Sequence, residues 1–144
     1  MLRAMATDQK LKLLKTVPLF VTCSDREIER LGMLVEEVDL PAGRVLFHQG
    51  DTAQELFIIV SGQVRIERDG AVLANSGPGD FFGEIALVTE GTRTATATCV
   101  SPCQLLVLGH RDFHSLMDEF PALKMRVLET LAKRVRALDT AAVH

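Results

Sequence analysis

The chain has 144 residues, of which 47% are hydrophobic and 24% are charged, and its formal net charge at pH 7 is −3. This length supports one domain with a substantial core but hardly two. The ordinary charge balance gives no electrostatic reason to expect a nucleic acid or an anionic membrane as a partner of the whole chain.

The first 20 residues alternate charged and apolar side chains. They lack the continuous apolar run of a signal peptide or a membrane span, so we expect a cytoplasmic protein. Cys23, Cys99 and Cys103 are odd in number and lack zinc-ribbon spacing, which favours reduced, structural thiols. Cys99 and Cys103 flank a turn and are expected on successive strands, where a redox pair is the less favoured alternative.

Two short helices are predicted in the N-terminal region. The first covers residues 9–16 and is ended by Pro18. The second follows Ser24, a good N-cap residue, with acids in its first turn, and is predicted over residues 25–38. Its apolar stripe consists of Ile28, Leu31, Leu34 and Val35.

From Asp39 to Gly109 short apolar runs alternate with turn signals, and eight of the ten glycines lie between Gly43 and Gly91. The pair Asp69-Gly70 predicts a type I′ hairpin, because both positions of that turn need a positive φ. Short, regularly spaced strands without intervening long helices predict an antiparallel roll or barrel. The runs are "RVLFHQGD", "ELFIIVSG", "QVRIERDG", "AVLANSGPGD", "TATATCVSP" and "CQLLVLG".

The C-terminal region returns to helix, with Pro121 at a first-turn position. An apolar stripe spans only about two heptads, so it can cover the domain or pair two chains. From Pro121 onward five basic residues face two acidic ones, and without interleaved aromatics they favour a solvated helix face over a binding patch. The stripe is Leu128, Leu131, Val135, Leu138 and Ala142; the charges are Lys124, Arg126, Lys133, Arg134 and Arg136, with Glu129 and Asp139.

The stretch "DFFGEIALVTEGTRTATATCV" places Glu84 and Arg93 nine positions apart in a run of apolar and small residues. Free N–H groups at the start of a single helical turn bind an anion, and an arginine adds a bidentate partner for phosphate oxygens. Glu84 would repel that phosphate, so it must face donors such as ribose hydroxyls. The alternative is an exposed Glu84–Arg93 ion pair, which would contribute about 1 kcal/mol at most.

The segment "FGEIALVTEGTRTAT" resembles the phosphate-binding cassette of cyclic nucleotide-binding domains. Residues 82–87 match its Phe-Gly-Glu-(Leu/Ile)-Ala-Leu part, and residues 93–96 match its Arg-(Thr/Ser/Ala)-Ala-(Thr/Ser) part. The likeness extends over about residues 11–139, through "VPLF", "LPAGRVLFHQGD" and "LFIIVSGQVRI".

The resemblance implies a mainly β fold, an eight-stranded antiparallel β-roll (jelly roll) with an N-terminal helical bundle and C-terminal B and C helices. We expect one domain over residues 1–144. The bundle would cover about residues 5–37, the roll about 38–109 and the C-terminal helices about 110–140.

The resemblance also implies the roles of individual residues. Arg93 would bind the equatorial phosphate oxygen, and Glu84 would accept a hydrogen bond from the ribose 2′-hydroxyl. Gly83 would let the backbone approach the sugar. Backbone N–H groups of Ala86, Thr94 and Ala95 would bind the other phosphate oxygens; Phe82 and Leu87 would pack beneath the cassette; Val64 and Ile85 would line the base pocket; Arg134, Val135 and Leu138 are candidates for the lid.

We therefore expect a non-catalytic sensor of a 3′,5′-cyclic purine nucleotide, cAMP in preference to cGMP, that acts on a second copy or an effector through its last helix. The alternative is the effector-sensing half of a CRP/FNR-like transcription regulator. A cupin-type metal enzyme is disfavoured, because His110 and His114 lie outside the roll and lack a third ligand. No catalytic motif, metal site or cofactor is expected.

Overall fold

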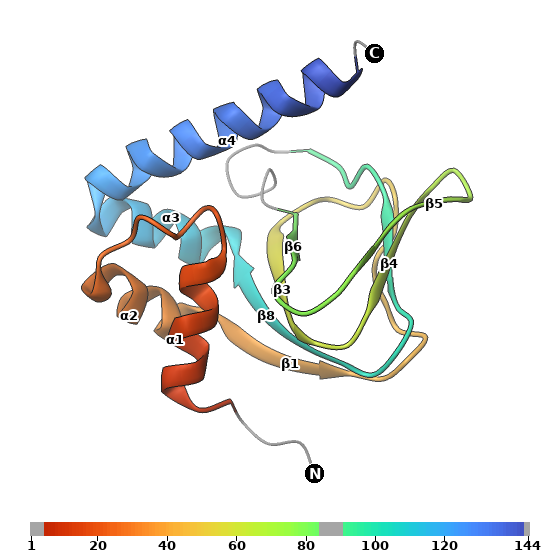
Figure 1. The fold of residues 1–144 in the computed structure, drawn as a ribbon, viewed down its shortest axis with the longest axis horizontal. Helices are drawn as coiled ribbons and strands as arrows, with labels where there is room; N and C mark the ends of the chain where they lie inside the picture. The colour runs from red at the N-terminus through yellow and green to blue at the C-terminus, as the bar shows by residue number, and fades with distance from the viewer. Residues whose placement is uncertain (1–4, 84–90, 143–144) are drawn as a thin grey trace.

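A computed structural model describes residues 5–83 and 91–142, with side chains in the last helix up to Thr130 and those of Ala132 and Lys133. The described part contains four helices and eight strands (Figure 1). The helices are α1 (Thr7–Thr16), α2 (Asp25–Leu34), α3 (His110–Glu119) and α4 (Pro121–Ala142); the strands are β1 (Glu36–Leu40), β2 (Val45–Phe47), β3 (Glu55–Ser61), β4 (Val64–Arg68), β5 (Ala71–Ser76), β6 (Phe81–Phe82), β7 (Thr96–Cys99) and β8 (Cys103–Gly109).

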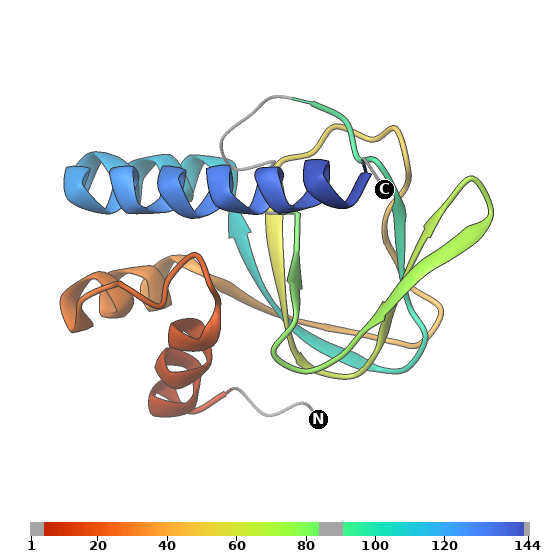
Figure 2. The same cartoon turned by 45° about the horizontal axis from the view of Figure 1, so that its top comes forward.

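The strands form two four-stranded antiparallel sheets, in the orders β1-β8-β3-β6 and β2-β7-β4-β5. The helices lie on the side of the first sheet, and α4 runs from this side toward the end of the roll (Figures 1 and 2). This arrangement confirms the predicted fold class, a mainly β roll with flanking helices.

Two hydrophobic cores lie on opposite faces of the first sheet. Successive side chains of a strand point to opposite faces, so Leu56 and Ile58 of β3 pack against the helices, whereas Phe57 and Ile59 point into the roll. Burial on both faces explains why β3 is almost continuously apolar. The core inside the roll is the one that borders the candidate site.

The N-terminus of α2 has the predicted N-cap, Ser24, which forms a capping box with Glu27. The Ser24 hydroxyl accepts a hydrogen bond from the Glu27 N–H at 3.2 Å, and the Glu27 carboxylate accepts one from the Ser24 N–H at 2.8 Å. The helix ends at Leu34, not at residue 38 as predicted. Residues 36–40 instead form β1, because pairing with β8 outweighs the local helical pattern.

The predicted turn signals are confirmed. Asp69 and Gly70 have φ values of 51° and 81°, as a type I′ turn requires. Pro121 is the first residue of α4. Cys99 and Cys103 lie on successive strands, and all three cysteines are free and buried.

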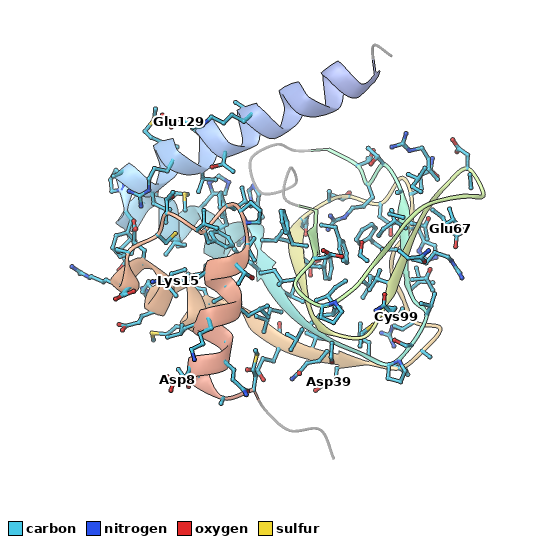
Figure 3. The ribbon with its side chains drawn as sticks, in the orientation of Figure 1. Asp8, Lys15, Asp39, Glu67, Cys99 and Glu129 are labelled. Carbon is cyan, nitrogen blue, oxygen red and sulfur yellow. The ribbon has the colours of Figure 1, made fainter. Side chains whose placement is uncertain are left out.

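The prediction of a solvated charged face on α4 is wrong for Arg126. Its Nη2 donates to the two carboxylate oxygens of Glu27 at 2.6 and 2.8 Å, and the Glu27 side chain is only 8% exposed. Glu129, by contrast, points away from the domain (Figure 3). Since Leu123 and Val127 are fully buried in the helical core, the first two turns of α4 are anchored to the domain.

Candidate functional site

Arg93 lies three residues before the start of β7, on a segment that pairs with the connection between β2 and β3. Its backbone N–H donates to the Asp51 carbonyl at 2.7 Å, and its carbonyl accepts from the Gly50 N–H at 2.8 Å. The antiparallel pairing of these two segments continues beyond Arg93. Thr52 forms a β-bridge with Thr92, and the Ala53 N–H donates to the Gly91 carbonyl. The arginine is therefore fixed by backbone pairing on both sides of its Cα atom.

The Arg93 side chain points into the protein, and the residue is only 6% exposed. Its Nη2 donates to the Glu55 carbonyl at 3.0 Å, while Nε has no hydrogen-bond partner among the described residues. The guanidinium forms no ion pair with a carboxylate whose side chain the structure describes. Burial lowers the pKa of Arg93, and the nearby charges of Glu55 and Asp51 only partly oppose this effect.

Two phenylalanine rings contact the guanidinium, and a third packs against these two. The Arg93 Cζ lies 4.2 Å from the ring centre of Phe47 and 5.6 Å from that of Phe57. Phe82 completes the cluster, with ring centres 5.4 Å from Phe57 and 5.9 Å from Phe47. Phe82 thus belongs to an aromatic cluster that includes the two rings next to Arg93, and its packing beneath the cassette stays a prediction.

Gly83 allows the backbone to approach this arginine. Its φ is +88°, and a Cβ atom here would lie 2.6 Å from Arg93 Nη1 and 2.7 Å from the Glu55 carbonyl oxygen. Both the conformation and the space therefore require glycine.

Thr94, which is exposed, and Ala95, which is buried, follow Arg93 in the chain. The Thr94 carbonyl accepts from Arg68 Nε at 3.1 Å. In the described part of the chain, no acceptor binds the backbone N–H of Thr94 or Ala95. Because backbone donors normally have partners, the pair beside a buried guanidinium suits an anion with several oxygens.

The other predicted site residues are placed less completely. Glu84, Ile85, Ala86 and Leu87 lie outside the described residues. Val64 is fully buried in the core inside the roll, opposite Cys99. Arg134, Val135 and Leu138 lie on α4, but their side chains are not described. Contact of these residues with a ligand stays a prediction.

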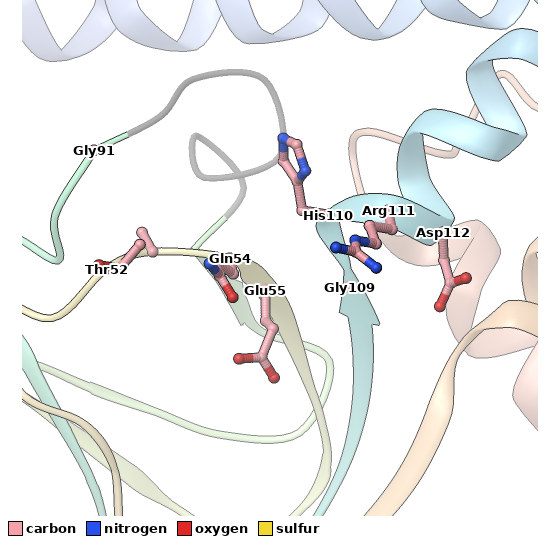
Figure 4. A pocket seen from close by; sticks show the side chains of 9 residues that line it. Thr52, Gln54, Glu55, Gly91, Gly109, His110, Arg111 and Asp112 are labelled. Carbon is pink, nitrogen blue, oxygen red and sulfur yellow. The ribbon is translucent and has the colours of Figure 1, made fainter.

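A pocket of about 550 Å³ opens where β3 begins and β8 passes into α3 (Figure 4). Residues 52–55, Gly91 and residues 109–112 line it. The carboxylates of Glu55 and Asp112 point away from the side on which the His110 ring stands (Figure 4). Sequence patterns do not predict this pocket, because its lining comes from three distant segments.

The two histidines that begin α3 lie next to each other. His110 and His114 contact each other through their Nε2 atoms at 3.0 Å. Among the described residues, no group of three His, Cys, Asp or Glu side chains could hold a metal ion. The part of the chain that the structure describes also contains no helix long and apolar enough to span a membrane.

The alternative considered from sequence, an exposed ion pair between Glu84 and Arg93, does not agree with the structure, because Arg93 is buried. Arg93 is thus a buried cation next to two backbone N–H groups that have no acceptor among the described residues, an arrangement that suits an anion. A family model described as the cyclic nucleotide-binding domain matches residues 37–120, more than half of the chain. The chain belongs to the cyclic nucleotide-binding domain family.

Individual proteins and structures support this assignment. The cyclic AMP receptor protein of Thermus thermophilus is 37% identical over 123 residues, which are 75% of this chain and 57% of that protein. The N-terminal domain of a transcriptional regulator from Streptomyces coelicolor A3(2) matches with a TM-score of 0.81 and 34% identity, over 90% of this chain and 96% of that one. The regulatory domain of Toxoplasma gondii PKA, solved with cAMP, matches with a TM-score of 0.72 and 32% identity, over 76% and 44% of the two chains. The chain thus spans little more than half the length of the receptor protein.

Sequence reasoning missed the groups that hold Arg93. Phe47 and Phe57 read as ordinary core residues of two strands, and the Glu55 carbonyl carries no side-chain signal. Only the fold shows that these groups surround one guanidinium.

Proposed function

We propose that this chain is a non-catalytic sensor domain that binds a 3′,5′-cyclic purine nucleotide, with cAMP preferred over cGMP. The observation that carries the proposal is the buried Arg93 guanidinium. Among the described residues it has no carboxylate partner, and the backbone N–H groups of Thr94 and Ala95 that follow it have no acceptor. A buried cation is costly unless it is paired, so an anionic ligand that completes the site is strongly favoured.

In the bound state Arg93 contacts the equatorial oxygen of the cyclic phosphate. The backbone N–H groups of Thr94 and Ala95, together with that of Ala86, bind the other oxygens. Glu84 accepts from the ribose 2′-hydroxyl, and Gly83 lets the backbone approach the sugar. Val64 and Ile85 line the base pocket. These roles follow from the family cassette, and the geometry of Arg93, Gly83, Thr94 and Ala95 supports the phosphate part of them.

Titration calorimetry tests this proposal with cAMP, cGMP and, as a control, 5′-AMP. We expect saturable binding of both cyclic nucleotides, tighter for cAMP, and much weaker binding of the open-chain monophosphate, whose additional charge and different shape do not match the site. The absence of binding of either cyclic nucleotide at millimolar concentration would refute the proposal.

The preference for cAMP is supported by the T. gondii structure with cAMP and by the name of the T. thermophilus relative. Thr94 is exposed, and a hydroxyl at this position can contact the 2-amino group of a syn guanine. If Thr94 makes that contact, Thr94→Ala lowers affinity for cGMP and leaves affinity for cAMP unchanged. A wild-type preference for cGMP would contradict the proposed selectivity.

The signal leaves the domain through α4 in this proposal. The anchored first turns of α4 fix where the helix starts, and its later turns run toward the end of the roll (Figures 1 and 2). Arg134, Val135 and Leu138 then close over the base as a lid, with Gly109 and Pro121 as pivots at the two ends of α3. A ligand shifts such an equilibrium only by its different affinity for the two states.

Hydrogen exchange separates the lid from a permanently docked helix. Protection of residues 122–139 should increase with cyclic nucleotide, together with that of the cassette. Protection gained by the cassette alone would show that the signal leaves through another surface.

A second candidate function is the effector-sensing half of a transcription regulator, supported by the relatives in T. thermophilus and S. coelicolor. An output partner, a cytoplasmic location and a possible homodimer belong to the same proposal. A pull-down with the product of the full natural open reading frame, with and without cAMP, distinguishes a DNA-binding output from an interaction with another protein.

A further inference from the structure

The position of Phe47 is set by the pairing of β2 with β7. Val45 lies opposite Thr98 and Phe47 opposite Ala97, with a register shift between them. After β2 the chain continues beside residues 93–96, where the Gln49 N–H donates to the Thr96 hydroxyl at 2.9 Å. Phe47 is therefore brought under Arg93 by backbone pairing on both strands.

The contact between the two side chains has the geometry of a cation–π interaction. The Arg93 Cζ lies 4.2 Å from the Phe47 ring centre, well within the range in which the ring quadrupole attracts a cation. Phe57 and Phe82 pack against the ring of Phe47, at 5.6 and 5.9 Å between ring centres. The ring is thus a rigid support for the guanidinium.

An aromatic support has a chemical advantage over a carboxylate at this position. A carboxylate would hold the arginine by its N–H groups and would compete with a phosphate for them. A ring face holds the delocalised cation through its plane and leaves the N–H edge available. The Nε of Arg93, which has no hydrogen-bond partner in the described part of the chain, agrees with this division of roles.

We propose that Phe47 is a positioning residue for the bound nucleotide: it holds the Arg93 guanidinium flat, with its donor edge directed at the phosphate. This inference rests on the proposed function. It concerns a residue outside the cassette. In this view an aromatic ring, and not a counter-ion, orients the Arg93 guanidinium before the nucleotide binds.

The test compares Phe47→Leu and Phe47→Tyr with the wild-type chain by calorimetry with cAMP and cGMP. Leucine removes the ring face, and affinity for both nucleotides should fall by the same factor, about 2- to 30-fold, which is the range expected for a cation–π contact. Tyrosine keeps the ring face and should restore affinity. Leu40→Ala, a truncation in β1 that packs against the same core, controls for general loss of stability.

An equal factor for the two nucleotides separates this role from a structural one, because a disturbed base pocket would change the ratio of cAMP to cGMP affinity. NMR of the wild-type chain gives an independent readout. The Arg93 Hδ protons should show the upfield shift of protons stacked on a ring, and this shift should disappear in Phe47→Leu.

The outcomes separate this inference from the proposed function. If the wild-type chain binds neither nucleotide, both fail. If it binds them and Phe47→Leu binds equally well, or if Phe47→Tyr binds as poorly as Phe47→Leu, or if the Arg93 protons show no ring-current shift, the inference alone is wrong.

Discussion

Alanine substitutions at Gly83 and Gly79 separate two destabilising effects, backbone strain at a positive φ and a steric clash of the added Cβ atom. Gly83 and Gly79 have nearly identical φ values, +88° and +87°. An added Cβ at Gly79 meets no atom within 4 Å, whereas at Gly83 it would lie 2.6 Å from Arg93 Nη1 and 2.7 Å from the Glu55 carbonyl oxygen. Gly79→Ala therefore measures backbone strain alone, and Gly83→Ala measures strain plus displacement of the arginine.

The strain of a non-glycine residue at such a φ is about 1–2 kcal/mol, so both variants should lose at least that much stability. A clash in a packed site adds about 1–3 kcal/mol, which Gly83→Ala alone should show. For a domain of this size, strain alone should lower Tm by roughly 3–7 °C.

The assay is chemical denaturation of both variants, followed by calorimetry with cAMP. Gly79→Ala should bind cAMP like the wild type. Gly83→Ala should bind at least about tenfold more weakly, a loss of about 1.4 kcal/mol, because the guanidinium can no longer lie against the Glu55 carbonyl. Equal stability losses together with unchanged affinity in Gly83→Ala would refute the reasoning that Gly83 makes room for Arg93.

Two further predictions concern buried ionisable groups. Burial opposes ionisation of Glu27, but hydrogen bonds from Ser24 and Arg126 outweigh this effect and hold the pKa of its carboxyl group below the ordinary value of 4.5. The ionised carboxylate therefore stabilises the folded state. This contribution is fully present above pH 4.5 and is lost as the pH falls through the lower pKa of the folded state. Glu27→Gln should therefore lower the free energy of unfolding at pH 7 by about 1–3 kcal/mol and should flatten the acid limb of the stability profile, and an unchanged acid limb would contradict the assignment. Burial raises the pKa of the Cys99 thiol to about 12, so native protein at pH 7.5 should resist iodoacetamide at Cys99 by mass spectrometry, and rapid alkylation there would show that the thiol is not held in the core.

The sequence predicts the fold well because its local signals agree with the tertiary structure. Ser24 and Glu27 form their capping box within four residues, and Asp69-Gly70 forms its turn without help from distant groups. Residues 36–38 continue the helical pattern, yet they form β1 because β8 offers them backbone partners. A pattern local to one segment cannot report a partner about 70 residues away.

The candidate site likewise contains residues that the sequence predicts and residues that only the fold brings together. Arg93 and Gly83 are predicted from the cassette, which is contiguous in sequence. The support from Phe47, Phe57 and the Glu55 carbonyl comes from two other strands, and a core phenylalanine looks the same in sequence whether or not a cation lies on its ring. The ion pair of Arg126 with Glu27 also joins residues 99 positions apart. The charge pattern of α4 alone therefore predicts a solvated face and does not reveal this contact.

The central claim is that Arg93 binds the phosphate of a cyclic nucleotide, and calorimetry of Arg93→Ala with cAMP tests it most directly. Removal of a charge-assisted interaction worth about 1.5–3 kcal/mol or more should weaken binding by at least about tenfold. Arg44→Ala, which removes an exposed arginine elsewhere on the roll, should bind cAMP like the wild type. Equal affinity of Arg93→Ala and the wild type for cAMP would contradict the account.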